Sequence, residues 1–409
     1  MSCNGFDMNI LYIGRFFSKR LINSALANNV GMSNHNFEMS IINGFCQCEK
    51  INLSCLTIPA VYSYPYNNKQ IYTKREIYNY NGSRVCSVGF CNLPILKEIW
   101  STIALSVQIV EAVSRFSGDK VHIIINTASN NLMNALRIAK LFTNKKLSQT
   151  VIIPDIPAMV SAMDGNNRLK EFALKYRNRR AMDMLSQSNG LVLLTEAMKD
   201  FVNKSIPYVV MEGIVDVESM DVTTANELHS DKEVILYTGS LRKIFGVMNL
   251  VHAFQMLKDV NAELWICGSG DSKNAIENAA KEDSRIKFWG LVDSETALKK
   301  QRQATILVNP RTSEGEYTKY SFPSKTMEYL LSAKSVIINR LEGIPEEYYR
   351  YVYVPENESV AALAECIRHV SEMNHEQRAI KAMEGREFVI KKKNSKVQTS
   401  RIIEMISKY

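Results

Sequence analysis

The richest group of chemically useful side chains in the sequence lies between Tyr320 and Glu328, where the chain reads Tyr-Ser-Phe-Pro-Ser-Lys-Thr-Met-Glu. Apolar residues then recur at the spacing of one helical face, and the fixed φ of Pro323 suits a first helical turn. A helix N-terminus offers unpaired N–H groups to phosphate, and a carboxylate one turn later accepts hydrogen bonds from ribose hydroxyls. This pairing suits a nucleoside diphosphate. The residues assigned to this side of the site are Tyr320, Ser321, Phe322, Pro323, Ser324, Lys325 and Glu328.

A second anion site is expected where the apolar run 234–238 gives way to Gly-Ser-Leu-Arg-Lys and then to a helical pattern. A strand, a glycine turn and a helix N-terminus favour negative charge, and two basic side chains add to it. Glycines after the next two apolar runs permit close approach of the backbone to a ligand. The residues assigned here are Gly239, Ser240, Arg242, Lys243 and Gly268, with Leu291 beside a base.

Simpler readings exist for both groups. Glu328 could be a surface carboxylate that the positive end of a helix dipole favours. Arg242 and Lys243 could be solvated charges on an ordinary turn. The motifs therefore need support from the elements that position them.

Those elements alternate along the chain. Short apolar runs rich in β-branched residues are separated by helical patterns, which predicts parallel sheets with crossover helices, and the runs lack alternation, as in strands buried on both faces. The expected strands are 9–13, 52–58, 85–90, 121–125, 150–153, 190–194, 208–211, 234–238, 263–267, 286–289, 305–308, 335–338 and 351–354. The expected helices include 94–116, 130–142, 168–186, 247–258, 294–303, 323–332 and 360–373.

This number of strands is more than one open sheet usually carries. The polar stretch 217–232 lacks apolar periodicity and predicts a linker between two doubly wound domains, 1–216 and 233–374. The last segment, 375–409, is helical and basic, and we expect it to pack back onto the first domain. Two such domains would present the carboxyl ends of their strands to one central cleft, where open α/β sheets bind ligands.

Composition narrows the class of protein. The 409 residues are 46% hydrophobic and 22% charged, as in an average soluble protein. No signal peptide or membrane-spanning run is evident, and the eight cysteines show no zinc spacing, so we expect a cytoplasmic protein with reduced thiols and no bound metal. The net charge of +8 alone fits nucleic acid, acidic small molecules or an anionic membrane.

In this order the motifs resemble the donor-binding domain of the retaining glycosyltransferases of family 4, which have the GT-B fold of two Rossmann-like domains. The resemblance covers about residues 189–359. It rests on Thr195-Glu196, Glu212–Asp216, Gly239, Gly246, Gly268–Asp271, Gly290, Asn309-Pro310, Ser321–Tyr329 and Gly343–Glu346. The Phe-Pro-Ser-Lys form is similar to the branch that builds capsular, O-antigen and exopolysaccharide repeat units.

The chain departs from the family pattern at three places. The family has a first Glu eight positions before the second, where this chain has Tyr320, with Glu314 and Glu316 nearby. It has Arg and Lys where this chain has Ser240 and Phe245. Its His-Asp motif corresponds to a Pro followed by Asp155.

The resemblance implies that a hexosyl group moves from a nucleotide sugar, which we expect to be a UDP-sugar, to a glycan or lipid-linked diphosphate glycan with retention. The candidate catalytic residues are Lys243 for the charge of the leaving group, Asp155 for the acceptor hydroxyl, and Glu316 in place of the first carboxylate. No paired-aspartate motif for a metal ion is present, which predicts metal-independent transfer, and no cofactor is implied.

The first half should bind the acceptor. Its basic stretch 168–180 is either a solvated helix or a contact with anionic lipid at the inner membrane face, and nucleic acid is no longer the favoured partner. Two other functions stay open: a GT-B sugar-nucleotide epimerase, and a glycosyltransferase-like partner subunit without activity.

Overall fold

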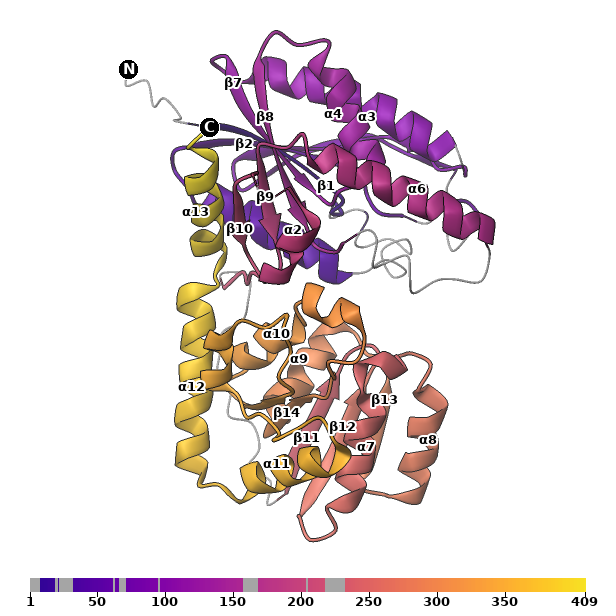
Figure 1. Cartoon of the computed structure of the whole chain (residues 1–409), viewed down its shortest axis with the longest axis vertical. Coiled ribbons are helices and arrows are strands. Elements are labelled where there is room, and N and C mark those ends of the chain that lie inside the picture. The colour runs from indigo at the N-terminus through magenta and orange to yellow at the C-terminus, as the bar shows by residue number, and fades with distance from the viewer. Residues whose placement is uncertain are drawn as a thin grey trace. The chain divides into compact units, whose positions relative to one another are not determined.

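The computed structural model describes residues 8–18, 21, 32–61, 63–65, 71–94, 96–156, 168–203, 205–217 and 232–409. The chain divides into two compact units (Figure 1), Met1–Asp216 with Asn394–Tyr409, and Val217–Lys393. Nearly all of the expected linker 217–232 lies outside the described residues. Of the segment 375–409, helix α13 (Ser395–Ile406) belongs to the first unit, whereas α12 (His375–Lys392) belongs to the second.

The first unit is built on an eight-stranded sheet with the order β10-β9-β8-β7-β1-β2-β5-β4. Neighbouring strands are parallel except β4 and β5. The strands are β1 (Met8–Gly14), β2 (Ile51–Thr57), β4 (Glu76–Tyr80), β5 (Ser83–Ser87), β7 (Lys120–Asn126), β8 (Lys146–Ile153), β9 (Gly190–Leu193) and β10 (Tyr208–Val210). A separate pair joins β3 (Tyr72–Thr73) to β6 (Phe90–Cys91).

Helices cover both faces of this sheet. On one face α2 (Met32–Cys46) and α13 pack together, and their apolar side chains share a core with β1, β2, β7, β8 and β9. On the other, α3 (Leu96–Arg115) and α4 (Asn130–Lys140) pack together, and α6 (Arg168–Leu185) lies against α4. This burial on both faces explains why the strand runs lack alternation.

The antiparallel pair β4 and β5 is a hairpin, and β4 is not among the expected strands. Its turn is Asn81-Gly82, and both residues have positive φ, at 46° and 82°. Asn-Gly is the preferred pair for such turns because both positions need a left-handed backbone. The expected strand 85–90 is divided in the structure, because β5 ends at Ser87 and the separate strand β6 begins at Phe90.

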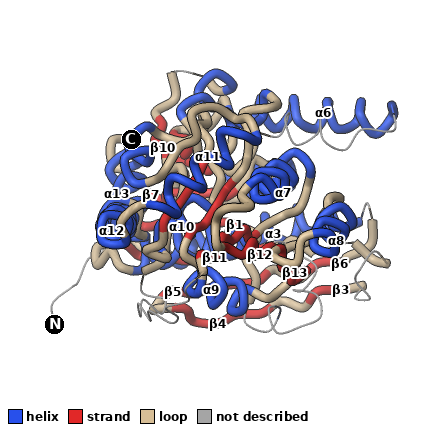
Figure 2. Tube along the Cα trace, turned by 90° about the horizontal axis from the view of Figure 1, so that it is seen from below, coloured by secondary structure: helices blue, strands red, loops and turns tan. Residues whose placement is uncertain are grey.

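The second unit contains a five-stranded parallel sheet with the order β13-β12-β11-β14-β15. Figure 2 labels three neighbouring strands of this sheet, β11, β12 and β13. The strands are β11 (Glu233–Thr238), β12 (Ala262–Cys267), β13 (Ile286–Gly290), β14 (Ile306–Asn309) and β15 (Ser335–Ile338). One face is covered by α7 (Val247–Met256), α8 (Lys273–Glu282) and α11 (Val360–Glu372). The other carries α9 (Ser294–Gln303), α10 (Lys325–Leu331) and α12.

The predicted strand 351–354 is wrong. A 3-10 helix, η5 (Glu346–Tyr351), occupies the start of this run, and only an isolated bridge between Tyr353 and Ile337 remains. None of the helices in the described part of the chain is long and apolar enough to cross a bilayer.

Candidate functional site

Two glycine loops at the carboxyl ends of β11 and β12 are held together through their backbones. Gly239 N donates to Cys267 O at 3.0 Å, and Leu241 N donates to Ser269 O at 2.9 Å. Gly268 has a φ of +149°, and a Cβ placed there would lie 1.8 Å from the carbonyl oxygen of Gly239. Only glycine permits this approach, so the predicted site residues Gly239 and Gly268 are brought together.

The end of β13 joins the same edge. Gly268 N donates to Gly290 O at 2.7 Å, and Gly290 has a φ of +66°. Leu291 follows directly and is 78% exposed. The structure therefore places Leu291 at the surface, directly after the glycine that contacts the loop at Gly268.

The basic pair begins the short 3-10 helix η3 (Lys243–Phe245), for which Arg242 is the N-cap. The backbone N–H of Lys243 donates to Asp271 Oδ1 at 2.8 Å. Both basic side chains are exposed, and neither forms an ion pair with another residue that the structure describes. Their positive charge is thus available to a ligand at the mouth of the glycine loops.

A further cation, Arg311, lies behind this turn. It is 5% exposed, and its guanidinium lies 5.6 Å from the ring centroid of Phe245 and 5.1 Å from that of Tyr317. Gly246, with a φ of +72°, lets the chain pass the carbonyl oxygen of Pro310, which would lie 2.3 Å from an added Cβ. Arg311 was not among the predicted site residues, although its place directly after Asn309-Pro310 is a visible signal.

Glu328 is held from two sides. Its carboxylate accepts hydrogen bonds from Lys325 Nζ at 2.7 and 2.8 Å, and Gln301 Nε2 donates to Oε1. Gln301 is 1% exposed, and Nε2 also donates to Thr238 Oγ1 at 3.1 Å. The Glu328 side chain keeps 30% exposure, and a carboxylate has about four acceptor positions, so it can still accept bonds from a ligand.

Tyr329 ties the same helix to the end of β11. Its buried hydroxyl accepts from Thr238 N at 2.9 Å and donates to Thr238 O at 3.2 Å. Burial raises the pKa of this phenol well above its usual value, which keeps the donating proton in place. The position of Glu328 relative to the glycine loops is therefore set by two buried side chains, Gln301 and Tyr329.

Helix α10 begins at Lys325, with Ser324 as its N-cap, so the prediction that Pro323 occupies the first helical turn is wrong. Pro323 instead accepts from Thr326 N at 2.9 Å, just before the helix. Phe322 is buried, with its ring 5.3 Å from that of Tyr348. Ser321 and Ser324 flank Phe322 and Pro323 on the loop that leads into α10.

The position of the expected first carboxylate is occupied by a buried residue. Tyr320 is 6% exposed, and Lys319 Nζ lies 5.1 Å from its ring centroid. The side chain of Glu316 is 66% exposed and pairs with Lys319 at 3.6 Å within the same 3-10 helix, η4 (Glu316–Tyr320). Among the contacts of the described residues, none joins Glu316 to Glu328.

Asp155 belongs to the first unit, where it lies exposed two residues after β8. Its assigned role in binding the acceptor stays a prediction. Within the described ranges, no three His, Cys, Asp or Glu side chains gather as they would around a metal ion.

The first unit also contains a buried carboxylate that sequence reasoning missed. Glu38 in α2 has no exposed surface, and its oxygens accept from Arg15 N, each at 3.0 Å, and from Tyr12 Oη at 3.1 Å. Burial raises the pKa of Glu38 to about 7, although these hydrogen bonds oppose the shift. The carboxylate lies against Gly14, at the carboxyl end of β1.

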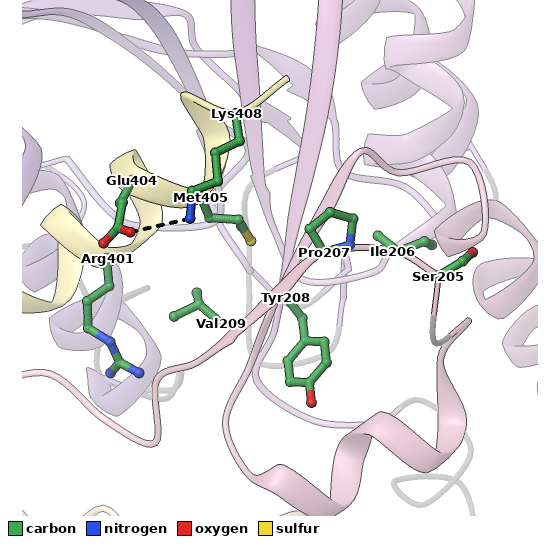
Figure 3. Close-up of a pocket in the computed structure, with 9 residues that line it drawn as sticks. All are labelled: Ser205, Ile206, Pro207, Tyr208, Val209, Arg401, Glu404, Met405 and Lys408. Carbon is green, nitrogen blue, oxygen red and sulfur yellow. Dashed lines mark hydrogen bonds and ion pairs between the residues drawn. The ribbon is translucent and has the colours of Figure 1, made fainter.

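A cavity of about 490 Å³ lies in the first unit, between the edge strand β10 and α13. Figure 3 shows the residues that line it. It is lined by Tyr208 and Val209 on one side and Arg401 and Met405 on the other. None of the predicted site residues lines it.

The match to a known protein family falls within the second unit. Residues 232–373 match the family described as glycosyl transferases group 1. No curated protein of similar sequence was found.

Solved structures match over the whole chain at low identity. Sucrose-phosphate synthase from Thermosynechococcus elongatus is 15% identical, with 98% of each chain covered and a TM-score of 0.62. Anabaena Alr3699/HepE in complex with UDP is 13% identical, covering 98% of this chain and 100% of that one, with a TM-score of 0.60. Trehalose 6-phosphate synthase from Burkholderia multivorans is 7% identical, covering 98% and 96%, with a TM-score of 0.65.

These likenesses confirm the predicted fold class of two Rossmann-like domains. The chain has the GT-B fold, and its match to the glycosyl transferases group 1 family over residues 232–373 supports a GT-B glycosyltransferase.

Proposed function

We propose that the protein transfers a hexosyl group from a nucleotide sugar, a UDP-sugar, to a glycan or lipid-linked glycan acceptor with retention at the anomeric carbon. The observation that carries this proposal is Glu328, a partly exposed carboxylate fixed beside the glycine loops. The solved structure of Anabaena HepE with UDP, which shares the fold, is consistent with such a donor.

Each predicted donor contact has a chemical role. Glu328 accepts hydrogen bonds from the two ribose hydroxyls, since an ionised carboxylate is an acceptor only. Arg242 and Lys243 attract the diphosphate, because their charges are exposed and unpaired within the described part of the chain. The backbone at Leu291 meets the base. The glycines 239 and 268 let the backbone come close to the phosphates.

The chemical step requires stabilisation of a developing negative charge. As the glycosidic bond breaks, negative charge collects on the diphosphate leaving group, and cations placed at that point lower the barrier. We assign this role to Lys243, with Arg242 beside it. A retaining path on one face of the sugar needs no strong protein nucleophile, and we assign Asp155 to orient or deprotonate the acceptor hydroxyl. No residue is assigned to a metal ion.

The acceptor side rests on the resemblance alone. We propose a role in capsule or exopolysaccharide biosynthesis, with the first unit binding the acceptor at the inner face of the membrane. Most side chains of the basic stretch 168–180 lie outside the described residues, so its contact with lipid stays a prediction.

The direct test is calorimetric titration of the full chain with UDP in the presence of a chelator. We expect binding without added metal, and Glu328→Ala should weaken it about tenfold or more, because hydrogen bonds to a charged group contribute roughly 1.5–3 kcal/mol. Glu277→Ala is the matched control, since Glu277 is an exposed helical carboxylate paired with Lys273 in α8. Equal UDP affinity of the Glu328 variant and the wild type would remove Glu328 from the site.

One observation favours the non-catalytic alternative. Tyr320 is buried where the family has its first carboxylate, and Glu316 pairs with Lys319 instead. A subunit of this kind would bind UDP and turn over no donor. Release of UDP from a UDP-sugar by the isolated chain would exclude it, whereas binding without turnover of any donor tested would favour it.

A further inference from the structure

Helix α3 carries a row of large apolar side chains that stay exposed among the described residues of its unit. Five residues that recur once or twice in each turn lie on one face: Leu96, Ile99, Trp100, Ile103 and Val107, which are 50%, 57%, 53%, 57% and 58% exposed. We call this row the α3 stripe. The opposite face of α3 is buried through Leu105, Ile109 and Val113, so the helix is apolar on two sides. Packing against the sheet accounts for only one of them.

The stripe continues into a groove. A cavity of about 740 Å³ lies between α3 and α4 and is lined in part by Ile99, Ile103, Ile138 and Leu141. At the end of α4, Leu141 is 80% exposed and the neighbouring Phe142 is 70% exposed. Contiguous apolar surface of this kind on a folded protein marks a binding surface for a protein or a membrane.

The charges beside the stripe decide between these partners. Arg137 of α4 and Arg180 of α6 line the same groove, and neither forms an ion pair within the described residues. Glu98 is the one acidic residue among those that line it. Apolar side chains that include an indole, bordered by arginines, are typical of a surface that lies in the headgroup region of an anionic bilayer.

We infer that the α3 stripe, with Arg137 and Arg180 at its border, binds the surface of an anionic lipid bilayer. The apolar side chains enter the acyl boundary, and the guanidinium groups meet lipid phosphates. Contact of this kind needs no spanning helix, and none of the helices described is suited to span. The inference deepens the proposed function, because it names the surface through which the chain would reach a lipid-linked acceptor. It does not depend on the donor site.

The test is co-sedimentation of the full chain with vesicles of phosphatidylcholine alone or mixed with phosphatidylglycerol. We expect binding to the anionic vesicles, and a loss of about tenfold or more in the Ile99→Ser/Ile103→Ser double variant. The matched control is Met256→Ser/Ile380→Ser, which removes two side chains of similar exposure, 53% and 55%, from the second unit. That control should bind as the wild type does.

Two further measurements separate the causes of a negative result. Trp100 is one of three tryptophans, and its emission should shift to shorter wavelength on anionic vesicles, a shift that Trp100→Phe removes. Arg137→Glu/Arg180→Glu should weaken binding to anionic vesicles and leave thermal unfolding unchanged. UDP affinity of every variant should equal that of the wild type, which distinguishes loss of the surface from loss of the donor site.

Wild-type protein that ignores anionic vesicles would overturn the inference, as would an Ile99→Ser/Ile103→Ser variant that binds them normally. A dimer in sedimentation velocity that this variant dissociates, with no binding to vesicles, would instead assign the stripe to a second copy of the chain.

Discussion

The Nε2 atom of Gln301 donates a hydrogen bond to Oε1 of Glu328, so a buried amide of α9 fixes the carboxylate of α10. The same nitrogen donates to Thr238 Oγ1 at the end of β11. One side chain thus relates the carboxylate to the strand that precedes the first glycine loop. Gln301 acts on a ligand only through Glu328, as a positioning residue.

Gln301→Met should weaken UDP binding roughly three- to tenfold, since one hydrogen bond to a charged group is lost while the length of the side chain is kept. Calorimetry with UDP measures the change, and Gln303→Met, in the same helix, is the control. A variant that binds UDP as tightly as the wild type but unfolds more easily would show that Gln301 is only structural. The Glu328→Ala/Gln301→Met double variant should bind no worse than Glu328→Ala alone.

Gly268 and Gly290 both have a positive φ, but only an added Cβ at Gly268 would meet another loop. Comparing alanine variants of the two therefore tests the backbone contact between the glycine loops. Gly268→Ala should lower the free energy of unfolding of the second unit by about 3 kcal/mol or more, because its Cβ would lie 1.8 Å from Gly239 O. Gly290→Ala should cost only about 1 kcal/mol, since no atom lies within 4 Å of its added Cβ. Urea unfolding of both variants measures the difference. Equal losses would mean that the two loops are not held in backbone contact.

Lys243→Ala should weaken UDP binding about tenfold, because it removes an exposed cation from the mouth of the glycine loops. The effect should shrink in high salt, where exposed charges are screened. Lys281→Ala, an exposed lysine of α8, is the control for net charge. A loss that is the same in low and high salt would argue against a direct charge contact.

Glu38 predicts a pH dependence in the first unit. Its pKa is raised from 4.5 to about 7 by burial, so the folded state favours the neutral acid. The stability that depends on this group is present below pH 4.5 and is lost as pH rises through 7. Relative to Glu38→Gln, which stays neutral, the wild type should lose on the order of 3 kcal/mol between pH 4.5 and pH 8. Urea unfolding of both proteins at these two pH values measures it, and a constant difference would contradict the shift.

The strand ends could be predicted because glycine follows an apolar run at residues 239, 268 and 290. The contact between the loops could not, because it depends on the register of β11 against β12, which pairs Thr238 with Cys267. The role of Gln301 in holding Glu328 could not be predicted from the sequence either. It is one polar residue among many in α9, and its partners lie 27 and 63 positions away.

Other differences had a visible cause. The Asn81-Gly82 pair is a hairpin signal that is visible in the sequence. The apolar run 351–354 is too short to decide between strand and loop, and η5 takes up its first residue. Glu38 lies within an apolar helical pattern, and sequence alone does not show that its charge is buried.

The division of the C-terminal segment bears on the order of folding during synthesis. Ile402, Met405 and Ile406 of α13 belong to the core that packs on β1 and α2, yet the ribosome makes them after the whole of the second unit. The second unit is continuous in sequence, from 217 to 393, and all of its strands are available before α13 emerges. The unit that begins first is therefore completed last, and until then the face of its sheet that carries α2 lacks α13.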